Sequence, residues 1–482
     1  MREGIKMLKL HQIGILILFI LASSAFAAAR NVMVPDSSIG AGELWSERAD
    51  SAQSTLDNDF WFPLGDIYFS SSSRSETRNY WWQAHAMDAL VMGYRRTGSS
   101  FYSSRMSSLY QGVYHSGGFT DSYYDDMEWM ALAFLRAYEV THDAYYMYEA
   151  NSLWQTIQGG WSVVPGGGGF QWSTKAMYKN VPANAPACIL ACKLYKDTGD
   201  TADLSWAEKI HAWIANNLVK PQSGIILDGI TYQDTVGTPN YGSYSYNYGT
   251  YLGASLYLYQ ITGDTTYLQE AEKEADVADT LFAASDGILR SEGTGDGGLF
   301  NGIYVYYLAK LIHQLTPNDS LGARYYNFMM NNADTLWEYG RQPGTGLFND
   351  NWQQPPSGSV SLSVELSGVT LMESATYVLG DSAVTAINQV GPDVPRKFDL
   401  YQNYPNPFNP STDIEVTLNR PGAMSIDIYN VLGQLVKVVA GGYRPDGEYA
   451  FDVDMDRYAS GVYFYTLREG TREITRKMLL LK

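Results

Sequence analysis

Two adjacent aspartates, Asp125 and Asp126, stand in the stretch SYYDDMEWMALAFLRAY, directly before a long apolar run. Hydrolysis of a glycosidic bond needs two carboxyl groups beside the bond, and enzymes that retain the sugar's configuration hold them about 5–5.5 Å apart. Adjacent residues in a first helical turn diverge by about 100° around the helix axis, which is compatible with that spacing. The pair could therefore supply a nucleophile and a general acid/base.

The same stretch also fits an ordinary helix N-terminus. Asp125 followed by Glu128 forms a capping box, in which the Asp accepts a free backbone N–H and the Glu reaches back to another. Two acidic residues in a first turn also suit the positive end of the helix dipole. This window alone favours capping, so the surrounding elements must decide between the two interpretations.

A recurring turn signal predicts those elements. The sequence reads RRTGSS, EVTHDA, KDTGDT, QITGDT and, as a variant, QLTPNDS, around Thr97, Thr141, Thr198, Thr262 and Thr316. A helical pattern lies on both sides of each turn, because Gly can end one helix in the left-handed conformation and Asp can cap the next. Helices at about 41–57 and 361–380 complete six helical hairpins. The sequence predicts a mainly α fold, an (α/α)6 barrel over residues 31–385, with the inner helices before the turns.

The connections at the other end are long and rich in Gly and aromatic residues, as in SVVPGGGGFQWSTKAMYKN and ILDGITYQDTVGTPNYGSYSYNYG. Loops of this length inside a compact domain are usually functional. They lead into inner helices that begin with NYWWQAHAMD, SYYDDMEW, YKNVPAN, YSYNYGTYLG and GLFNGIYVYY. We therefore expect Asp125 and Asp126 on the rim of a common cavity. There the helix dipole favours an ionised nucleophile, whose charge raises the pKa of its neighbour.

This ordered series of segments resembles glycoside hydrolase family 76 over most of residues 45–380. The family comprises endo-acting α-1,6-mannanases with an (α/α)6 barrel that retain configuration. The resemblance implies that Asp125 is the nucleophile and Asp126 the general acid/base. The resemblance also implies that Asp228 binds sugar, although Asp228 could equally be a turn residue before a glycine. It implies the same role for Tyr246 and Asn247, which match a sugar-binding element of the family. In this chain Tyr248 stands where that element has a glutamine.

Further candidate sugar-binding residues follow from their place on the rim. Trp172 lies in the long loop, and Lys179 and Asn180 lie before the next helix, where they could bind sugar hydroxyls or order the loop. Trp81 and Trp82 are adjacent on a helix, so only one of them can face the cavity, and we assign Trp82 to that role.

Composition narrows the class of protein. The 482 residues carry a net charge of −18, which argues against nucleic acid as a partner because phosphate binding needs surplus Lys and Arg. Tyr, Trp and Phe make up 14% of the residues, and aromatic faces suit neutral sugar rings. Cys188 and Cys192 lie four apart on one helix face, in geometry unsuited to a mutual disulfide, so we expect small core residues. The sequence contains no constellation of metal ligands, and GGGG at 166–169 lacks the following GK[ST] of a phosphate-binding loop. We therefore expect no metal site and no cofactor.

The two ends of the chain predict export. Residues 1–27 combine three basic residues, a short apolar run and an A-x-A site, as in a signal peptide. No other stretch could span a membrane, so we expect a mature protein without a membrane span. After a linker at 386–397, alternating apolar runs over 398–482 predict a small Ig-like β-sandwich.

This C-terminal region resembles a known sorting domain. YQNYPNPFNPST, IYNVLGQLV, YASGVYFY and RKMLLLK are similar to segments of the C-terminal sorting domain of type IX secretion substrates. The resemblance implies a didermal bacterial source, a secreted or surface-attached protein, and the type IX secretion machinery as a transient partner.

Together these features predict an exported, monomeric glycoside hydrolase that cleaves a mannan-type polysaccharide by double displacement. Two alternatives stay open. One is another (α/α)6-barrel glycosidase, such as an unsaturated uronyl hydrolase. The other is a surface glycan-binding protein whose barrel has lost catalysis.

Overall fold

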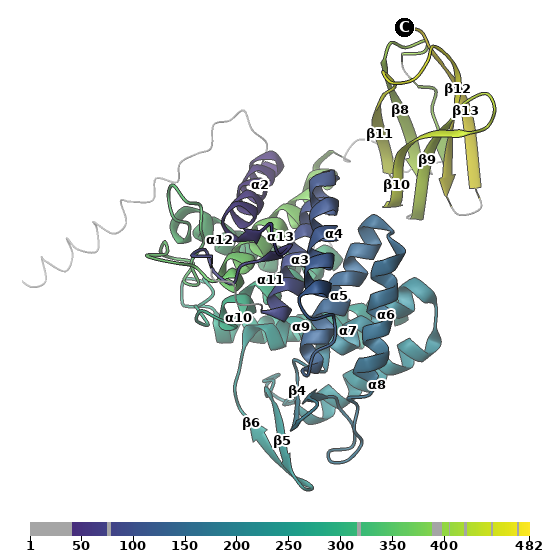
Figure 1. Ribbon diagram of the computed structural model, residues 1–482. Helices are drawn as coiled ribbons and strands as arrows, with labels where there is room; N and C mark the ends of the chain where they lie inside the picture. Colours follow the sequence, from purple (N-terminus) through teal and green to yellow (C-terminus); the bar gives the residue numbers. More distant parts are fainter. Residues whose placement is uncertain are drawn as a thin grey trace, which may run out of the picture. The chain divides into compact units, whose positions relative to one another are not determined.

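The computed structural model describes residues 41–74, 79–315, 320–387, 398–403, 405–418, 422–444, 447–469 and 472–482. The expected signal peptide lies outside the described residues, as does nearly all of the expected linker. Figure 1 shows the helical domain and the separate strand-rich domain that follows it in the chain.

Twelve α-helices make up the described part of the first domain. The six inner helices are α3 (Tyr80–Thr97), α5 (Tyr124–Thr141), α7 (Ala185–Thr198), α9 (Ser245–Thr262), α11 (Gly297–Gln314) and α13 (Leu362–Ile387). The six outer helices are α2 (Ala41–Phe60), α4 (Ser100–His115), α6 (Ala144–Gln158), α8 (Thr201–Asn217), α10 (Thr265–Phe282) and α12 (Ser320–Thr335), which continues into a π-helical turn, η1 (Leu336–Gly340).

The inner helices form a ring, because each packs against the next and α13 packs against α3. Each of α4, α6, α8 and α10 packs against the inner helix before it, and α12 packs against α11 and α13. Helix α2 completes the sixth pair, since Gln53 donates to the Ala89 carbonyl on α3 at 2.7 Å and to Glu373 on α13 at 2.9 Å. The predicted (α/α)6 barrel of six hairpins is confirmed.

The repeated turn works as the sequence predicted. Gly199 and Gly263 end inner helices at φ 76° and 71°, and His142 takes the same left-handed position at φ 60°. Asp200 and Asp264 then accept the backbone N–H two residues later, each at 2.9 Å, and so cap α8 and α10. The fifth turn lies partly outside the described residues. These short turns hold one end of the barrel and leave the other end to the long connections.

The ring is tight because its helices carry small residues where they meet. A Cβ added to Gly249 on α9 would lie 2.7 Å from the Cα of Tyr304 on α11, so only glycine permits this approach. Cys188 and Cys192 on α7 are fully buried and unpaired, which confirms them as small core residues.

A four-stranded antiparallel sheet stands in connections that the sequence analysis treated as loops. Its strands, in order, are β3 (Gln171–Ser173), β4 (Ala176–Asn180), β5 (Gly229–Gln233) and β6 (Val236–Asn240). The central pair joins two connections, with Tyr178 opposite Thr231 and Asn180 opposite Gly229. A further short hairpin consists of β1 (Trp61–Phe62) and β2 (Ile67–Tyr68). The four-stranded sheet stiffens one wall of the barrel mouth.

The C-terminal domain is the predicted β-sandwich. Its strands are β7 (Asp399–Leu400), β8 (Ser411–Leu418), β9 (Gly422–Tyr429), β10 (Leu435–Arg444), β11 (Gly447–Asp454), β12 (Gly461–Glu469) and β13 (Arg472–Leu480). One sheet has the order β10-β9-β12-β13 and the other β11-β8-β7. Residues such as Ile414, Ile426 and Tyr465 are fully buried in a core of the domain's own.

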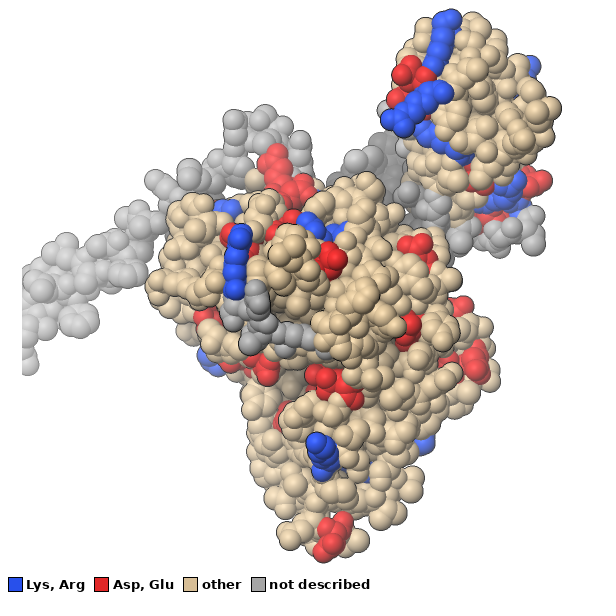
Figure 2. Space-filling view, viewed as in Figure 1, with Lys and Arg blue, Asp and Glu red and all other residues tan. Residues whose placement is uncertain are grey.

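Most of the surface seen in Figure 2 is uncharged, with scattered Asp and Glu and few Lys or Arg over the helical domain. Within the described residues, no helix combines the length and apolarity that crossing a bilayer requires.

Candidate active site

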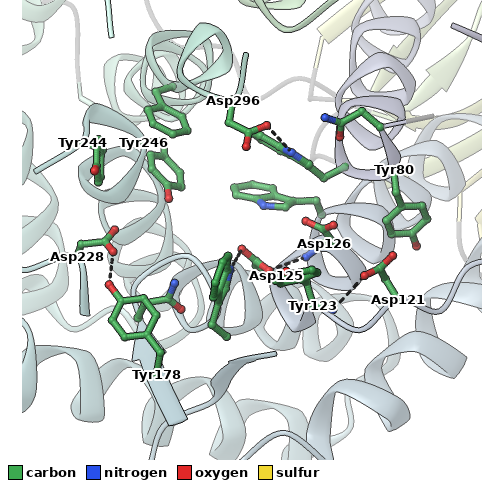
Figure 3. Close-up of a pocket in the computed structure, with 16 residues that line it drawn as sticks. Tyr80, Asp121, Tyr123, Asp125, Asp126, Tyr178, Asp228, Tyr244, Tyr246 and Asp296 are labelled. Atoms are coloured by element: carbon green, nitrogen blue, oxygen red, sulfur yellow. Dashed lines mark hydrogen bonds between the residues drawn. The ribbon is translucent and has the colours of Figure 1, made fainter. Parts of the chain in front are cut away.

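A cavity of about 790 Å³ opens where the inner helices begin. Asn79, Tyr80, Trp81, Asp121, Tyr123, Asp125, Asp126, Trp129, Trp172, Tyr178, Asn180, Asp228, Tyr244, Tyr246, Asp296 and Phe300 line it. They come from the starts of α3, α5, α9 and α11, from the segment that leads into α7, and from the β3–β6 sheet. Figure 3 shows Asp125 and Asp126 on α5 beside the open space, with Asp228 and Asp296 on the surrounding walls.

The first turn of α5 does not contain the expected capping box. Tyr123 is the N-cap, in extended conformation and without a side-chain capping bond. The Tyr123 backbone N–H donates to Oδ1 of Asp121 at 3.1 Å. Glu128 is fully buried, and neither of its carboxyl oxygens makes a regular hydrogen bond. Asp125 and Asp126 are therefore the second and third residues of the helix.

Asp125 and Asp126 differ in their hydrogen bonds. One oxygen of Asp125, Oδ1, accepts the backbone N–H of Asp126 at 3.1 Å, and Oδ2 accepts the indole N–H of Trp172 at 2.9 Å. The Asp126 carboxyl accepts no hydrogen bond from any described residue. Asp125 thus takes one donor from its own helix and still presents its carboxylate at the cavity.

This difference separates the two carboxyls electrostatically. Burial raises the pKa of Asp125, while the Trp172 indole and the backbone N–H of Asp126 oppose the rise. Burial also raises the pKa of Asp126 well above its usual value, and the neighbouring charge of Asp125 raises it further. When the pair holds one proton, Asp126 therefore holds it and Asp125 carries the charge.

Asp296 forms the opposite wall of the cavity. Its Oδ1 accepts the indole N–H groups of both Trp81 and Trp82, each at 3.1 Å. Trp81 lines the cavity, whereas Trp82 is buried and does not line it. The assignment of Trp82 is corrected to Trp81, because successive residues on α3 point about 100° apart and Trp82 packs in the hydrophobic core.

A third wall centres on Asp228. Its carboxylate accepts hydrogen bonds from the Tyr178 hydroxyl, from Asn247 at 3.0 Å and from Asn240 at 3.2 Å. Asn247 is fully buried and holds Asp228 instead of lining the cavity. Tyr246 does line it, with its ring stacked on Phe300 at 4.1 Å between centroids.

Lys179 and Asn180 have different surroundings. The Lys179 ammonium donates to the carbonyls of Ser162, Pro165 and Gly168, so it orders the glycine-rich loop and lies away from the cavity. This is the loop-ordering role that the sequence left open. Asn180 lines the cavity, and its side-chain oxygen accepts the N–H of Ala183 at 3.2 Å.

The sequence analysis assigned no site role to several lining residues, among them Asp121, Trp129, Tyr178 and Asp296. All of them stood in or near the aromatic and glycine-rich segments that mark the rim, but their spacing alone did not single them out. Of the described residues, five carboxylates and no Lys, Arg or His line this cavity, and no group could hold a metal ion.

Comparison with known proteins gives two matches within the chain. Residues 45–386 match the family described as Glycosyl hydrolase family 76, and residues 402–481 match the Secretion system C-terminal sorting domain. The sorting domain indicates that the protein is exported, to be secreted or attached to the cell surface.

Solved structures and curated relatives agree with the family match. The structure of the GH76A α-1,6-mannanase from Salegentibacter sp. HEL1_6 is 38% identical, with a TM-score of 0.67, over 69% of this chain and 99% of that one. An inactive variant of that mannanase, with two consecutive aspartates replaced by alanine, was solved with α-1,6-mannotetrose.

The curated relatives match shorter stretches. Mannan endo-1,6-alpha-mannosidase DCW1 of Saccharomyces cerevisiae is 27% identical over 151 residues, 30% of this chain and 33% of the relative. Mannan endo-1,6-alpha-mannosidase DFG5 of Candida albicans is 27% identical over 234 residues, which are 43% of this chain and 51% of the relative. The matches to these two relatives thus span a third to a half of their length. With more than half of the chain matching one family, this protein belongs to glycosyl hydrolase family 76.

Proposed function

We propose that this protein is an exported endo-α-1,6-mannosidase that cleaves mannan by double displacement, with Asp125 as nucleophile and Asp126 as general acid/base. The observation that carries the proposal is the unequal pair of carboxyls in one cavity. Asp125 is stabilised as an anion by two N–H donors, whereas Asp126 has none and its pKa is raised by burial and by the charge of Asp125, which favours its protonated form.

The reaction follows from these protonation states. Asp125 attacks the anomeric carbon, and Asp126 gives its proton to the departing glycosidic oxygen, so one C–O bond forms as the other breaks. Asp126, now ionised, takes a proton from water as that water attacks the glycosyl–Asp125 ester. The sugar is released with retained configuration, and both carboxyls return to their starting states.

Relatives support the choice of bond and of residues. The 38% identical protein is described as an α-1,6-mannanase, and replacing two consecutive aspartates inactivates it. In the present sequence Asp125–Asp126 is the single Asp-Asp dipeptide, so it is the candidate counterpart of that pair.

The charge of the cavity argues against the uronyl hydrolase alternative. A uronic acid carries a carboxylate, which needs a cation or several donors to offset its desolvation. Of the described residues, none that line this cavity is a cation, and five are carboxylates. Neutral hexoses fit better, because their hydroxyls can donate to Asp228 and Asp296 while Trp81 and Tyr246 offer aromatic faces.

Single substitutions test the pair. On α-1,6-mannan, we expect Asp126→Asn to lower kcat by about 10²–10⁴-fold, the usual contribution of general acid/base catalysis. Asp125→Asn should lose more, since no covalent intermediate can form. Asp143→Asn is a matched control, because Asp143 precedes α6 at the far end of the barrel and makes no side-chain capping bond.

Leaving-group chemistry separates the two roles. The leaving oxygen of a dinitrophenyl α-mannoside departs without being protonated by an acid. This substrate should therefore restore the glycosylation step in Asp126→Asn but not in Asp125→Asn. The first product should be the α-anomer by NMR. Full activity of either variant, or a β-anomer, would overturn the assignment. Wild-type protein that binds oligomannose without releasing reducing ends would instead favour the glycan-binding alternative.

A further inference from the structure

A second cavity, of about 580 Å³, lies beside the start of α13. Two segments of the described chain form most of it, one at 291–294 before α11 and one at 349–361 before α13, and Val364 on α13 completes the lining. Its volume falls within the range of small-molecule sites, roughly 300–1,000 Å³. It is separate from the Asp125–Asp126 cavity but opens at the same end of the barrel, where the inner helices begin.

The walls of this second cavity are held by the fold. The buried Glu365 carboxylate accepts the N–H of Phe348 at 3.0 Å, which fixes the segment's start. At its end, the hydroxyl of Ser72 accepts the N–H of Val360 at 2.9 Å. Between them Trp352 is 1% exposed and anchors the segment to the core. The cavity is therefore formed before any ligand arrives.

Its chemistry suits a neutral, hydroxyl-rich ligand. The lining consists of Ser and Thr hydroxyls, the amides of Asn349, Asn351 and Gln354, the Asp350 carboxylate, two prolines, a glycine and two valines. The described lining holds no Lys, Arg or His, so an anion would find no opposite charge there. The amide groups of the Asn351 and Gln354 side chains donate to no described residue, which leaves both free for a ligand.

One loop forms a wall of both cavities. Thr294 lines the second cavity and Asp296 lines the first. Two residues of extended chain span at most about 7 Å, so these two wall positions lie within that distance. The Ser291 hydroxyl ties the loop to Asp350 across the second cavity, and Glu292 ties it to the start of α9 by accepting the N–H of Ser245 at 3.1 Å. The two cavities are therefore neighbours that share one loop at the mouth of the barrel.

We propose that this second cavity is a distal saccharide subsite, which takes neutral hexose residues of the same glycan beyond those at the Asp pair. The inference rests on the proposed mannanase function for the identity of the glycan. It adds that the enzyme prefers long chains, because a short oligosaccharide cannot reach the subsite.

Two variants alter this subsite without touching the Asp pair. Ser357→Trp places a large side chain in the cavity from an exposed loop position, and Gln354→Ala removes a free amide. Gln222→Trp and Gln222→Ala are the matched controls, since Gln222 is exposed on another loop at this end of the barrel and lines neither cavity. All are made in the Asp125→Asn/Asp126→Asn background, and binding of α-1,6-linked mannobiose and mannooctaose is measured by calorimetry.

We expect Ser357→Trp to weaken mannooctaose binding about tenfold and Gln354→Ala to weaken it less, with mannobiose unaffected and both controls unchanged. Equal binding of mannooctaose by Ser357→Trp and its parent, or an equal loss for both sugars, would overturn the subsite. Cleavage of α-1,6-mannan by the wild-type enzyme is scored separately and tests the proposed function. If that cleavage is absent, binding of short and long neutral oligosaccharides of other linkages is compared between Ser357→Trp and its parent. If the two proteins bind every one of these oligosaccharides equally, the proposed subsite is overturned.

Discussion

Trp172→Phe isolates the hydrogen bond that distinguishes the two carboxyls of the Asp125–Asp126 pair. The change removes the indole N–H that donates to Asp125 at 2.9 Å. It keeps an aromatic ring beside Tyr123, whose ring centroid lies 4.8 Å from that of Trp172. Asp126 and the helix N-terminus are untouched, so the loss falls mainly on the ionised form of Asp125.

The size of the effect follows from the kind of bond. A hydrogen bond to a charged group contributes about 1.5–3 kcal/mol, and one pKa unit corresponds to about 1.4 kcal/mol. Burial already raises the pKa of Asp125 to about 7, and the indole opposes that rise. Without the indole the pKa should rise by about one to two units. Asp125, the proposed nucleophile, must be ionised to react. As the pH is lowered, the variant should therefore lose activity at a higher pH than the wild-type enzyme does.

The assay is the pH dependence of kcat/KM for release of reducing ends from α-1,6-mannan, which reports the free enzyme's essential groups. The acid limb should move upward by about one unit or more, while the alkaline limb, set by Asp126, moves less. Trp81→Phe is the control, since that indole donates to Asp296 and not to Asp125. It should lower kcat/KM without moving the acid limb. An unmoved acid limb in Trp172→Phe would refute the role given to this bond.

Three further predictions test the framework around the pair. Glu128→Gln should keep activity and fold, because burial raises the pKa of the Glu128 carboxyl well above its usual value, which favours a neutral group like the amide. Glu128→Ala should leave a cavity and lower the free energy of unfolding, measured in urea, by about 2–4 kcal/mol. Asp126 has a higher pKa in the folded state than in the unfolded state, so the wild-type protein loses stability as the pH rises from the unfolded-state pKa through the folded-state pKa. Asp126→Asn removes this loss and should raise Tm more at pH 8 than at pH 5. Equal increases in Tm at the two pH values would contradict this. A chain ending at residue 390 should keep its kcat/KM and its helical circular dichroism, because the barrel and the sandwich have separate cores, and an unfolded product would contradict that reading.

The architecture could be predicted because its signals are local. The turn at KDTGDT needs a left-handed residue and an N-cap within two positions, and the structure uses Gly199 and Asp200 for these tasks. Counting such turns gave the hairpins, and hairpins with short turns at one end place the long connections at the other. The alternating pattern after residue 398 likewise predicted the sandwich.

The details of the site could not be predicted, because they depend on contacts between distant segments. The β4–β5 pairing joins two connections on either side of the α7–α8 hairpin, and neither shows a regular strand pattern by itself. Lys179 stands beside Asn180 in sequence, yet its ammonium points to the carbonyls of the loop before it. Which of Trp81 and Trp82 faces the cavity depends on the rotation of α3, and a shift of one residue reverses the answer.

The Asp pair shows how two carboxyls at one helix start can acquire the different surroundings that the proposed mechanism needs. At the helix start, Asp125 behaves partly as a cap, because it accepts the N–H of Asp126. That bond uses one oxygen, and the other is held by Trp172, which lies 47 residues further along the chain on β3. The same donors that satisfy the helix end therefore lower the cost of ionising Asp125, whereas Asp126, without donors and next to that charge, keeps its proton. Local sequence supplies two similar carboxyls, and the tertiary contact makes them unequal, which is the condition that acid–base catalysis by a carboxyl pair requires.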